Sequence, residues 1–434
     1  MENELVVALL ALVLLLGLFA TGIELAFAMA ITGIVGYSCL YGFGTAAHMF
    51  ANDFYSSLSS YGLTVMPLFI LMGQIAFNTG IAKRLYDGSH KFVGHIPGGL
   101  AIATVLGATA FKAICGSVSA TAATFASVAV PEMDRFHYSR KLSTGMVAVA
   151  GTLGVLLPPS VILILFGLMT RLSISRLFLA GLFPGLIMAL FFGIIAYAWC
   201  KINPALGPRS DKFPWKERLA AIPGNIWPII IFLFIIVGLM KGIFSPTEAA
   251  SIGAFGVLLL SVIRKDINFK SFVKSVYEAL RTASMVQLMV AGSVVLGHLI
   301  TVTDISSIMA EWVLGLHVHR VFIVLLIFLF YLIGGSIIDD MAFMILATPI
   351  FYPVMVKLGY DPIWVGIMIA LVICVGCVIP PVAVCVFVVA NITKEPMRVI
   401  YAGCYPFLIS LFVVIGLLFV FPQIVLWLPS MLMP

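Results

Sequence analysis

Long apolar runs alternate with short polar segments along nearly the whole chain. Runs of about 18 or more uncharged residues recur, which is the length that a helix needs to cross a bilayer. They predict membrane spans at about 4–20, 23–42, 61–80, 142–170, 176–200, 226–243, 247–263, 283–300, 362–391 and 398–424. The pattern therefore predicts an all-α polytopic membrane protein with about ten transmembrane helices.

Two further apolar stretches, about 99–132 and 320–356, are too long for one straight span, and each has a glycine-containing centre. We interpret them as re-entrant helical hairpins. Such hairpins are tolerated at membrane depth only where protein surrounds them or where they line a cavity.

One span carries two prolines in its middle, in the run GVLLPPSVILILFG. Proline removes a backbone donor and clashes with the preceding turn, so Pro158-Pro159 should break the helix. The pair recurs as Pro380-Pro381, and a glycine stands four residues before each pair, Gly154 and Gly376. The sequence thus predicts two broken helices, about 142–170 and 362–391.

The breaks belong to an internal repeat. Gly73 and Gly116 are 43 residues apart, as are Gly292 and Gly335. LFLAGLFPGL (177–186) likewise matches VIYAGCYPFL (399–408) at the same distance from the prolines. We predict two repeats, 1–215 and 216–434, which face opposite ways because an odd number of crossings separates them. Inverted repeats with broken helices are typical of secondary transporters.

Composition and charge agree with a membrane protein. Of the residues, 62% are hydrophobic and 10% are charged, and the mean hydropathy is +1.18, which excludes an ordinary soluble domain. The net charge of +6 arises in loops such as 81–96, 133–141, 201–218 and 264–281, so it is no nucleic-acid footprint. The positive-inside rule places these loops in the cytoplasm. The start MENELVVALL lacks a basic leader, which predicts a retained first span.

Several motifs, taken in order, carry a family resemblance: MPLFILMGQIAFNTGIAKRL (66–85), CGSVSATAATFASVAVPEM (115–133), GTLGVLLPPSVILILFG (151–167), GIFSPTEAA (242–250), GGSIIDDMAFMILATPIFYPV (334–354) and GCVIPPVAV (376–384). The chain resembles the large membrane subunit of tripartite ATP-independent periplasmic (TRAP) transporters. The resemblance implies an elevator, in which a transport domain carrying both hairpins slides along a fixed scaffold domain.

The resemblance also implies partners and a coupling ion. Family members use a sodium gradient, accept a small organic acid from a periplasmic binding protein, and need a small four-helix membrane subunit. Since no extra helices are present, that subunit should be a separate chain in the bacterial inner membrane. No GxxxxGK[ST] phosphate loop occurs, and no cofactor other than Na⁺ is expected.

The resemblance also implies two sodium sites, whose ligands would be mostly main-chain carbonyl oxygens. The first set would be Cys115, Val118, Gly154, Leu157 and Pro158, and the second set Gly335, Gly376, Ile379 and Val382. The chain departs from the family where Cys115 replaces serine, Ile379 replaces threonine and Ala383 replaces glycine. A hydroxyl ligand is therefore missing at Ile379.

Four residues are candidates for substrate binding: Lys112, Ser117, Thr121 and Asp339. Lys112 could pair with a substrate carboxylate, act as a fixed charge replacing one sodium, or snorkel toward a neighbouring acid. Asp339 could instead cap the helix after the hairpin, and Ser117 and Thr121 could simply permit close packing.

Other functions are less well supported. A stand-alone elevator carrier for dicarboxylates would need no binding protein. A membrane-embedded enzyme needs a catalytic motif such as HExxH, which is absent, and a channel would not need paired hairpins. Cys374 and Cys377 form a CxxC pair without a second ligand pair, so small core residues are expected there.

Overall fold

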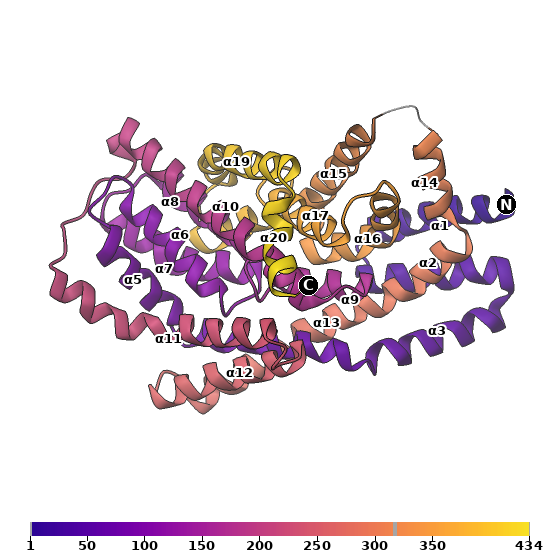
Figure 1. Ribbon diagram of the computed structural model, residues 1–434, viewed down its shortest axis with the longest axis horizontal. Coiled ribbons are helices and arrows are strands. Elements are labelled where there is room, and N and C mark those ends of the chain that lie inside the picture. Colours follow the sequence, from indigo (N-terminus) through magenta and orange to yellow (C-terminus); the bar gives the residue numbers. More distant parts are fainter. Residues whose placement is uncertain (1, 316–318, 434) are drawn as a thin grey trace.

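The computed structural model describes residues 2–315 and 319–433, and within them the chain is helical throughout, with no strand (Figure 1). Eight of the described helices are long and apolar enough to cross a membrane. The all-α polytopic fold predicted from the apolar runs is therefore confirmed.

Both predicted hairpins form helix–turn–helix units. The first consists of α6 (Gly99–Lys112) and α7 (Val118–Arg135), and the second of α15 (Arg320–Ile337) and α16 (Asp340–Lys357). Ser117 starts α7 by accepting a hydrogen bond from the Ala120 amide at 3.3 Å, and Asp339 starts α16 by accepting one from the Ala342 amide at 3.4 Å. These caps satisfy donors that would otherwise be orphaned at each turn.

Both double prolines interrupt a helix where the sequence predicted. In the first half α8 (Arg140–Thr152) leads through a short 3₁₀ turn, η2 (Leu153–Val155), and an irregular stretch to α9 (Val161–Thr170). In the second half α17 (Pro362–Gly376) is separated from α18 (Val384–Thr393) in the same way. The two breaks differ in environment, because residues 153–160 are all buried while Pro380, Pro381 and Val382 are exposed.

A second group of helices packs beside the hairpins and breaks. It comprises α1 (Glu2–Ala20), α2 (Leu25–Tyr41), α3 (Phe43–Leu58), α4 (Val65–Asn78), α11 (Trp215–Met240), α12 (Pro246–Ile263) and α13 (Phe269–Val302). Figure 1 shows α3, α11, α12 and α13 running along the lower side of the molecule, below the hairpin helices. We call this group the frame. Glycine lets two of its helices approach closely, since a Cβ on Gly292 of α13 would lie 2.4 Å from the Ala26 carbonyl oxygen of α2.

The apolar runs did not predict four of the helices, nor the first turns of α11 and α13. The missed helices are α3, α5 (Ile81–Val93), α14 (Ile305–Gly315) and α20 (Gln423–Leu432). The segments 43–60 and 81–96 are too polar for a search of apolar runs to identify them. Packing stabilises them as amphipathic helices instead, and the Asp53 carboxylate of α3 contacts the His298 imidazole of α13 at 2.6 Å.

The basic segments that were predicted to share one side contact one another. Arg84 forms a two-point ion pair with Asp266, at 2.8 and 3.1 Å, and Arg140 lies 3.5 Å from Glu395. The connection after α10 (Ile174–Ile202) also reaches the loop between α5 and α6, because the Ser210 amide donates to the Gly94 carbonyl at 3.0 Å. These contacts agree with a common side for the basic loops.

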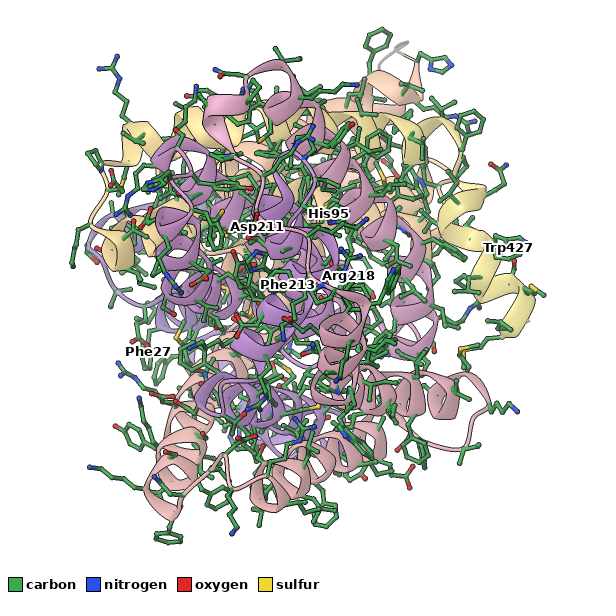
Figure 2. The ribbon with its side chains drawn as sticks, turned by 90° about the vertical axis from the view of Figure 1, so that its left-hand side faces the viewer. Phe27, His95, Asp211, Phe213, Arg218 and Trp427 are labelled. Atoms are coloured by element: carbon green, nitrogen blue, oxygen red, sulfur yellow. The ribbon has the colours of Figure 1, made fainter. Side chains whose placement is uncertain are left out.

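Figure 2 faces this connection and shows Phe213, Arg218 and His95 beside one another. The Arg218 side chain donates to the Phe213 carbonyl at 3.0 Å and lies 3.5 Å from the His95 ring nitrogen. Desolvation together with the positive charges of Arg218 and Lys212 lowers the pKa of His95. This direction favours the neutral imidazole, whose ring nitrogen can accept the guanidinium hydrogen bond.

The repeated Ala-Gly dipeptides mark the closest helix approaches around the breaks. A Cβ on Gly181 of α10 would lie 2.3 Å from the Leu156 carbonyl oxygen. A Cβ on Gly403 of α19 (Met397–Val420) would lie 1.9 Å from the Lys141 carbonyl oxygen of α8. Only glycine fits at either crossing without moving backbone.

We expect Gly403→Ala to destabilise the protein by about 1–3 kcal/mol or more, because the new methyl group meets backbone that cannot move aside. Gly416→Ala in the same helix is the control, since a Cβ there has no neighbour within 4 Å and alanine favours the helix. Apparent Tm in detergent checks both. Equal Tm values for the two variants would contradict the close approach of α19 to α8 at Gly403.

Candidate functional site

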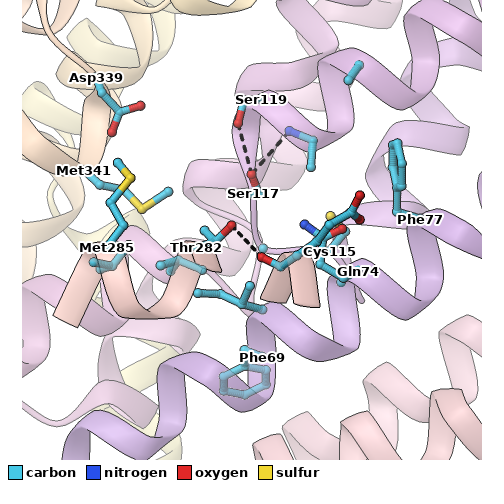
Figure 3. Close-up of a pocket in the computed structure, with 18 of the residues that line it drawn as sticks. Phe69, Gln74, Phe77, Cys115, Ser117, Ser119, Thr282, Met285, Asp339 and Met341 are labelled. Atoms are coloured by element: carbon cyan, nitrogen blue, oxygen red, sulfur yellow. Dashed lines mark hydrogen bonds between the residues drawn. The ribbon is translucent and has the colours of Figure 1, made fainter. Parts of the chain in front are cut away.

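A cavity of about 450 Å³ lies where the first hairpin, the second hairpin and the frame meet. The frame contributes residues of α4 and α13, among them Phe69, Gln74, Glu278, Thr282 and Met285. The hairpins contribute their turns: Cys115, Gly116, Ser117, Ser119, Asp339 and Met341. Figure 3 shows Asp339 and Met341 facing Ser117 and Ser119 across this space. The cavity has the size of a small-ligand site.

Glycine brings the frame against the first hairpin turn. A Cβ on Gly73 of α4 would lie 3.4 Å from the Cys115 Sγ atom and 3.8 Å from its Cβ. Gly73 is the residue whose spacing to Gly116 defines the sequence repeat. The turn therefore rests directly on α4 at one wall of the cavity.

The polar groups of the cavity are hydroxyls and carboxylates. The Ser117 and Ser119 hydroxyls lie 3.3 Å apart, and Glu278 accepts a hydrogen bond from the Asn78 amide at 3.4 Å. Lys274 lies 3.7 Å from Glu278 and partly balances its charge. Among the described residues, Glu278 and Asp339 are the charged ones that line the cavity, and no basic side chain lines it.

Three helices begin at the cavity, and their amide dipoles are a source of positive potential that opposes the charge of the two carboxylates. The first turns of α7 and α16 line it through Ser119, Ala120 and Met341, and α9 lines it through its first residue, Val161. Free amides and the helix dipole at such ends attract anions. The arrangement can hold a small anion against three helix starts.

The residues predicted for the first sodium set are brought together. A Cβ on Gly116 would lie 2.7 Å from the Pro159 carbonyl oxygen, and a Cβ on Gly151 would lie 3.4 Å from the Val118 carbonyl oxygen. The hairpin turn that holds Cys115 and Val118 thus packs on the break that holds Gly154, Leu157 and Pro158.

Lys112 ends among these same residues. Its side chain is completely buried, and its ammonium group donates to the Ser117 carbonyl oxygen. A Cβ on Gly154 would lie 1.6 Å from the Lys112 Nζ atom, so the amine rests against the Cα of that glycine. Lys112 is not among the residues that line the cavity. The amine is therefore placed at the break and away from the space where a substrate would sit.

The residues predicted for the second set also meet. A Cβ on Gly376 would lie 2.6 Å from the Gly335 carbonyl carbon. The amides of Val382 and Ala383 donate to the Ser336 carbonyl oxygen at 3.0 and 3.2 Å. Ile379 is partly buried in the same stretch, and Ala383 adopts a left-handed conformation with φ of 50°. Close backbone approach of this kind suits a cation held by main-chain oxygens.

The four residues predicted to bind substrate separate into two pairs. Ser117 and Asp339 line the cavity, and both also cap helices, as the alternative interpretation of Asp339 expected. Thr121 is buried and its hydroxyl donates to the Ser117 carbonyl at 3.0 Å, on the side of Lys112. The binding roles of all four remain predictions.

The sequence analysis overlooked the frame residues of the cavity. Gln74 follows Gly73 directly, so the repeat spacing could have identified it. Glu278 and Thr282 were not recognised as helix residues, because the span was predicted to begin at 283, whereas α13 begins at Phe269. Cys374 and Cys377 are buried core thiols, and the described residues contain no cluster of ligands suited to a metal ion.

The fold has a counterpart among solved structures. The crystal structure of the YdaH transporter from Alcanivorax borkumensis superposes with a TM-score of 0.63 at 13% identity, covering 88% of this chain and 90% of that one. At this identity the likeness shows a shared fold.

Sequence comparison identifies the family. The model of the DctM component of tripartite ATP-independent periplasmic transporters matches residues 12–424. The C4-dicarboxylate TRAP transporter large permease protein DctM of Pseudomonas aeruginosa is 31% identical, covering 88% of this chain and 89% of that protein. The sialic acid TRAP transporter large permease protein SiaM of Vibrio cholerae is 30% identical, covering 89% and 90%. The chain therefore belongs to the large permease family of TRAP transporters, as its ordered motifs predicted.

Proposed function

We propose that this permease imports a small organic anion across the bacterial inner membrane, driven by a sodium gradient. It works with a small membrane subunit and a periplasmic binding protein that delivers the substrate. The observation that carries the proposal is the cavity between the two hairpin turns and the frame, because a transported ligand needs a site shared by both halves of the chain.

The cavity favours a carboxylate as substrate. Related permeases are named for C4-dicarboxylates and for sialic acid, which are both organic acids. The starts of α7, α9 and α16 supply amides for a carboxylate, and the serine hydroxyls can donate to the same group. Phe69, Met285 and Met341 provide apolar surface for a short carbon skeleton.

Sodium coupling is supported by the backbone around the second break. Hard cations prefer oxygen ligands, and proline and glycine leave carbonyl groups without intrahelical partners. Gly335, Gly376, Ile379 and Val382 bring such backbone together in this half of the chain.

An elevator movement is supported by the boundary on which the cavity lies. Its walls come from two groups of helices, the frame and the hairpins, and the first hairpin touches α4 through glycine and a small thiol. Small residues at this contact permit sliding, because they allow the two backbones to approach closely.

Uptake into proteoliposomes tests the function. The chain is reconstituted with its small membrane subunit, the binding protein is added outside, and labelled dicarboxylates or sialic acid are supplied. We expect accumulation only under an inward sodium gradient, and no accumulation under a potassium gradient of equal size. Uptake without the binding protein would overturn the tripartite assignment, and equal uptake in both salts would overturn sodium coupling.

A disulfide between the frame and the first hairpin tests the movement. Gly73→Cys places its Cβ 3.8 Å from the Cys115 Cβ, which is about the usual separation in a disulfide. Because the bond would fix the hairpin against α4, oxidation should abolish uptake and a reducing agent should restore it. Thiol labelling before and after oxidation measures bond formation.

Gly73→Ser is the matched control, since it adds a side chain of similar size that cannot form the bond. The double variant Gly73→Cys, Cys115→Ser controls for a new thiol. A cross-linked permease that transports at the rate of its reduced form would refute sliding at this boundary.

A further inference from the structure

The buried end of Lys112 is the least expected group in the described part of the chain. A lysine without solvent must have its charge balanced by protein, since desolvating an ammonium is costly. Lys112 has 0% exposure, and the described acidic residues include none within ion-pair distance of it. The Asp340 carboxylate acts on it only through space.

One backbone oxygen, that of Ser117, accepts the hydrogen bond of the ammonium. The Ser117 carbonyl accepts from Nζ and also from the Thr121 hydroxyl, so this oxygen is turned toward the break. On the other side Nζ, Cε and Cδ of Lys112 lie 1.6, 2.1 and 2.5 Å from the position of a Cβ on Gly154. The amine thus sits between a hairpin turn and a broken helix.

This position coincides with the first predicted sodium set. That set places a cation between the same hairpin turn, at Cys115 and Val118, and the same break, at Gly154, Leu157 and Pro158. A sodium ion beside Gly154 would share this small space with an ammonium of the same charge. The residues present therefore do not fit a sodium ion here.

The second half of the chain provides an internal comparison. Lys112 stands four residues before Gly116, and Tyr331 stands four residues before Gly335. Tyr331 is also fully buried, but it is neutral and carries no amine. Ser336 follows Gly335 as Ser117 follows Gly116, and its carbonyl accepts the backbone amides of Val382 and Ala383. Only the first half therefore carries a built-in cation at this location.

We infer that the Lys112 ammonium is a tethered cation that takes the place of a sodium ion at the first site, so that only the second site binds a coupling ion. The inference rests on the proposed sodium coupling. It makes Lys112 a positioning residue, whose charge draws the hairpin carbonyl and the broken helix together in every transport state. A sodium ion would do so only when bound.

Sodium binding to purified, full-length permease with its small subunit tests this inference. Lys112→Ala removes the charge and opens the space, so it should bind one more sodium ion per chain than the wild type. Lys112→Met keeps the side-chain volume without the charge and should bind no additional ion. Scintillation counting of radioactive sodium, with choline chloride as the reference salt, gives the stoichiometry.

Stability provides a second measurement should Lys112→Ala fold poorly. If sodium fills the vacated position, the variant should be more stable in sodium chloride than in choline chloride, by a larger margin than the wild type. Equal stability in both salts, or equal ion counts for the wild type and Lys112→Ala, would overturn the tethered cation. If neither protein binds sodium at all, sodium coupling itself fails, which is a distinct result.

The contact with Gly154 has its own test. Gly154→Ala should lower the apparent Tm by at least about 5 °C, because the new methyl group overlaps an amine that has no free space around it. Combining it with Lys112→Ala should restore much of the loss. Gly193→Ala, where a Cβ has no neighbour within 4 Å, is the control. If the decreases in Tm of the two single variants simply add in the double variant, the amine does not contact Gly154.

Discussion

Backbone that leaves the helical conformation at membrane depth must find its hydrogen-bond partners inside the protein, and this constraint organises the permease. The described residues leave the helix in this way at two hairpin turns and two breaks, and each turn packs on the break of its own half. Gly116 lies against the Pro159 carbonyl, and Gly335 lies against Gly376. In the second half the two interruptions also share hydrogen bonds, because the Val382 and Ala383 amides donate to the Ser336 carbonyl.

The two halves are related by sequence but differ in their surroundings. The first turn rests on α4 through Gly73, whereas Gly292, which has the same spacing to its hairpin glycine, packs on α2. The first break is buried, while Val382 in the second break is 42% exposed. The first break is thus enclosed and the second is more open. An asymmetry of this kind agrees with the proposed alternating exposure of a shared site.

Much of this arrangement could be predicted from the sequence, because proline, glycine and apolar length act locally. Pro158-Pro159, Pro380-Pro381 and the glycine spacings located both breaks and both hairpins. Helices such as α3 and α5 could not be found in this way, since their polar faces become helical only through contacts made in three dimensions. The cavity wall at Glu278 was missed for the same reason. The sequence also marked Lys112 as unusual, but only the folded chain shows that its amine points at Gly154.

The buried Lys112 ammonium also bears on how the chain enters the membrane. Lys112 ends the first arm of a hairpin, and Gly154, against which its amine packs, lies about 40 residues later, beyond α7 and α8. While the ribosome is still making that stretch, the arm carries a charged group without its final surroundings. The buried environment of the amine is therefore complete only once the broken helix that follows has been made. A transporter with a mobile ion in this position would not have that dependence during synthesis.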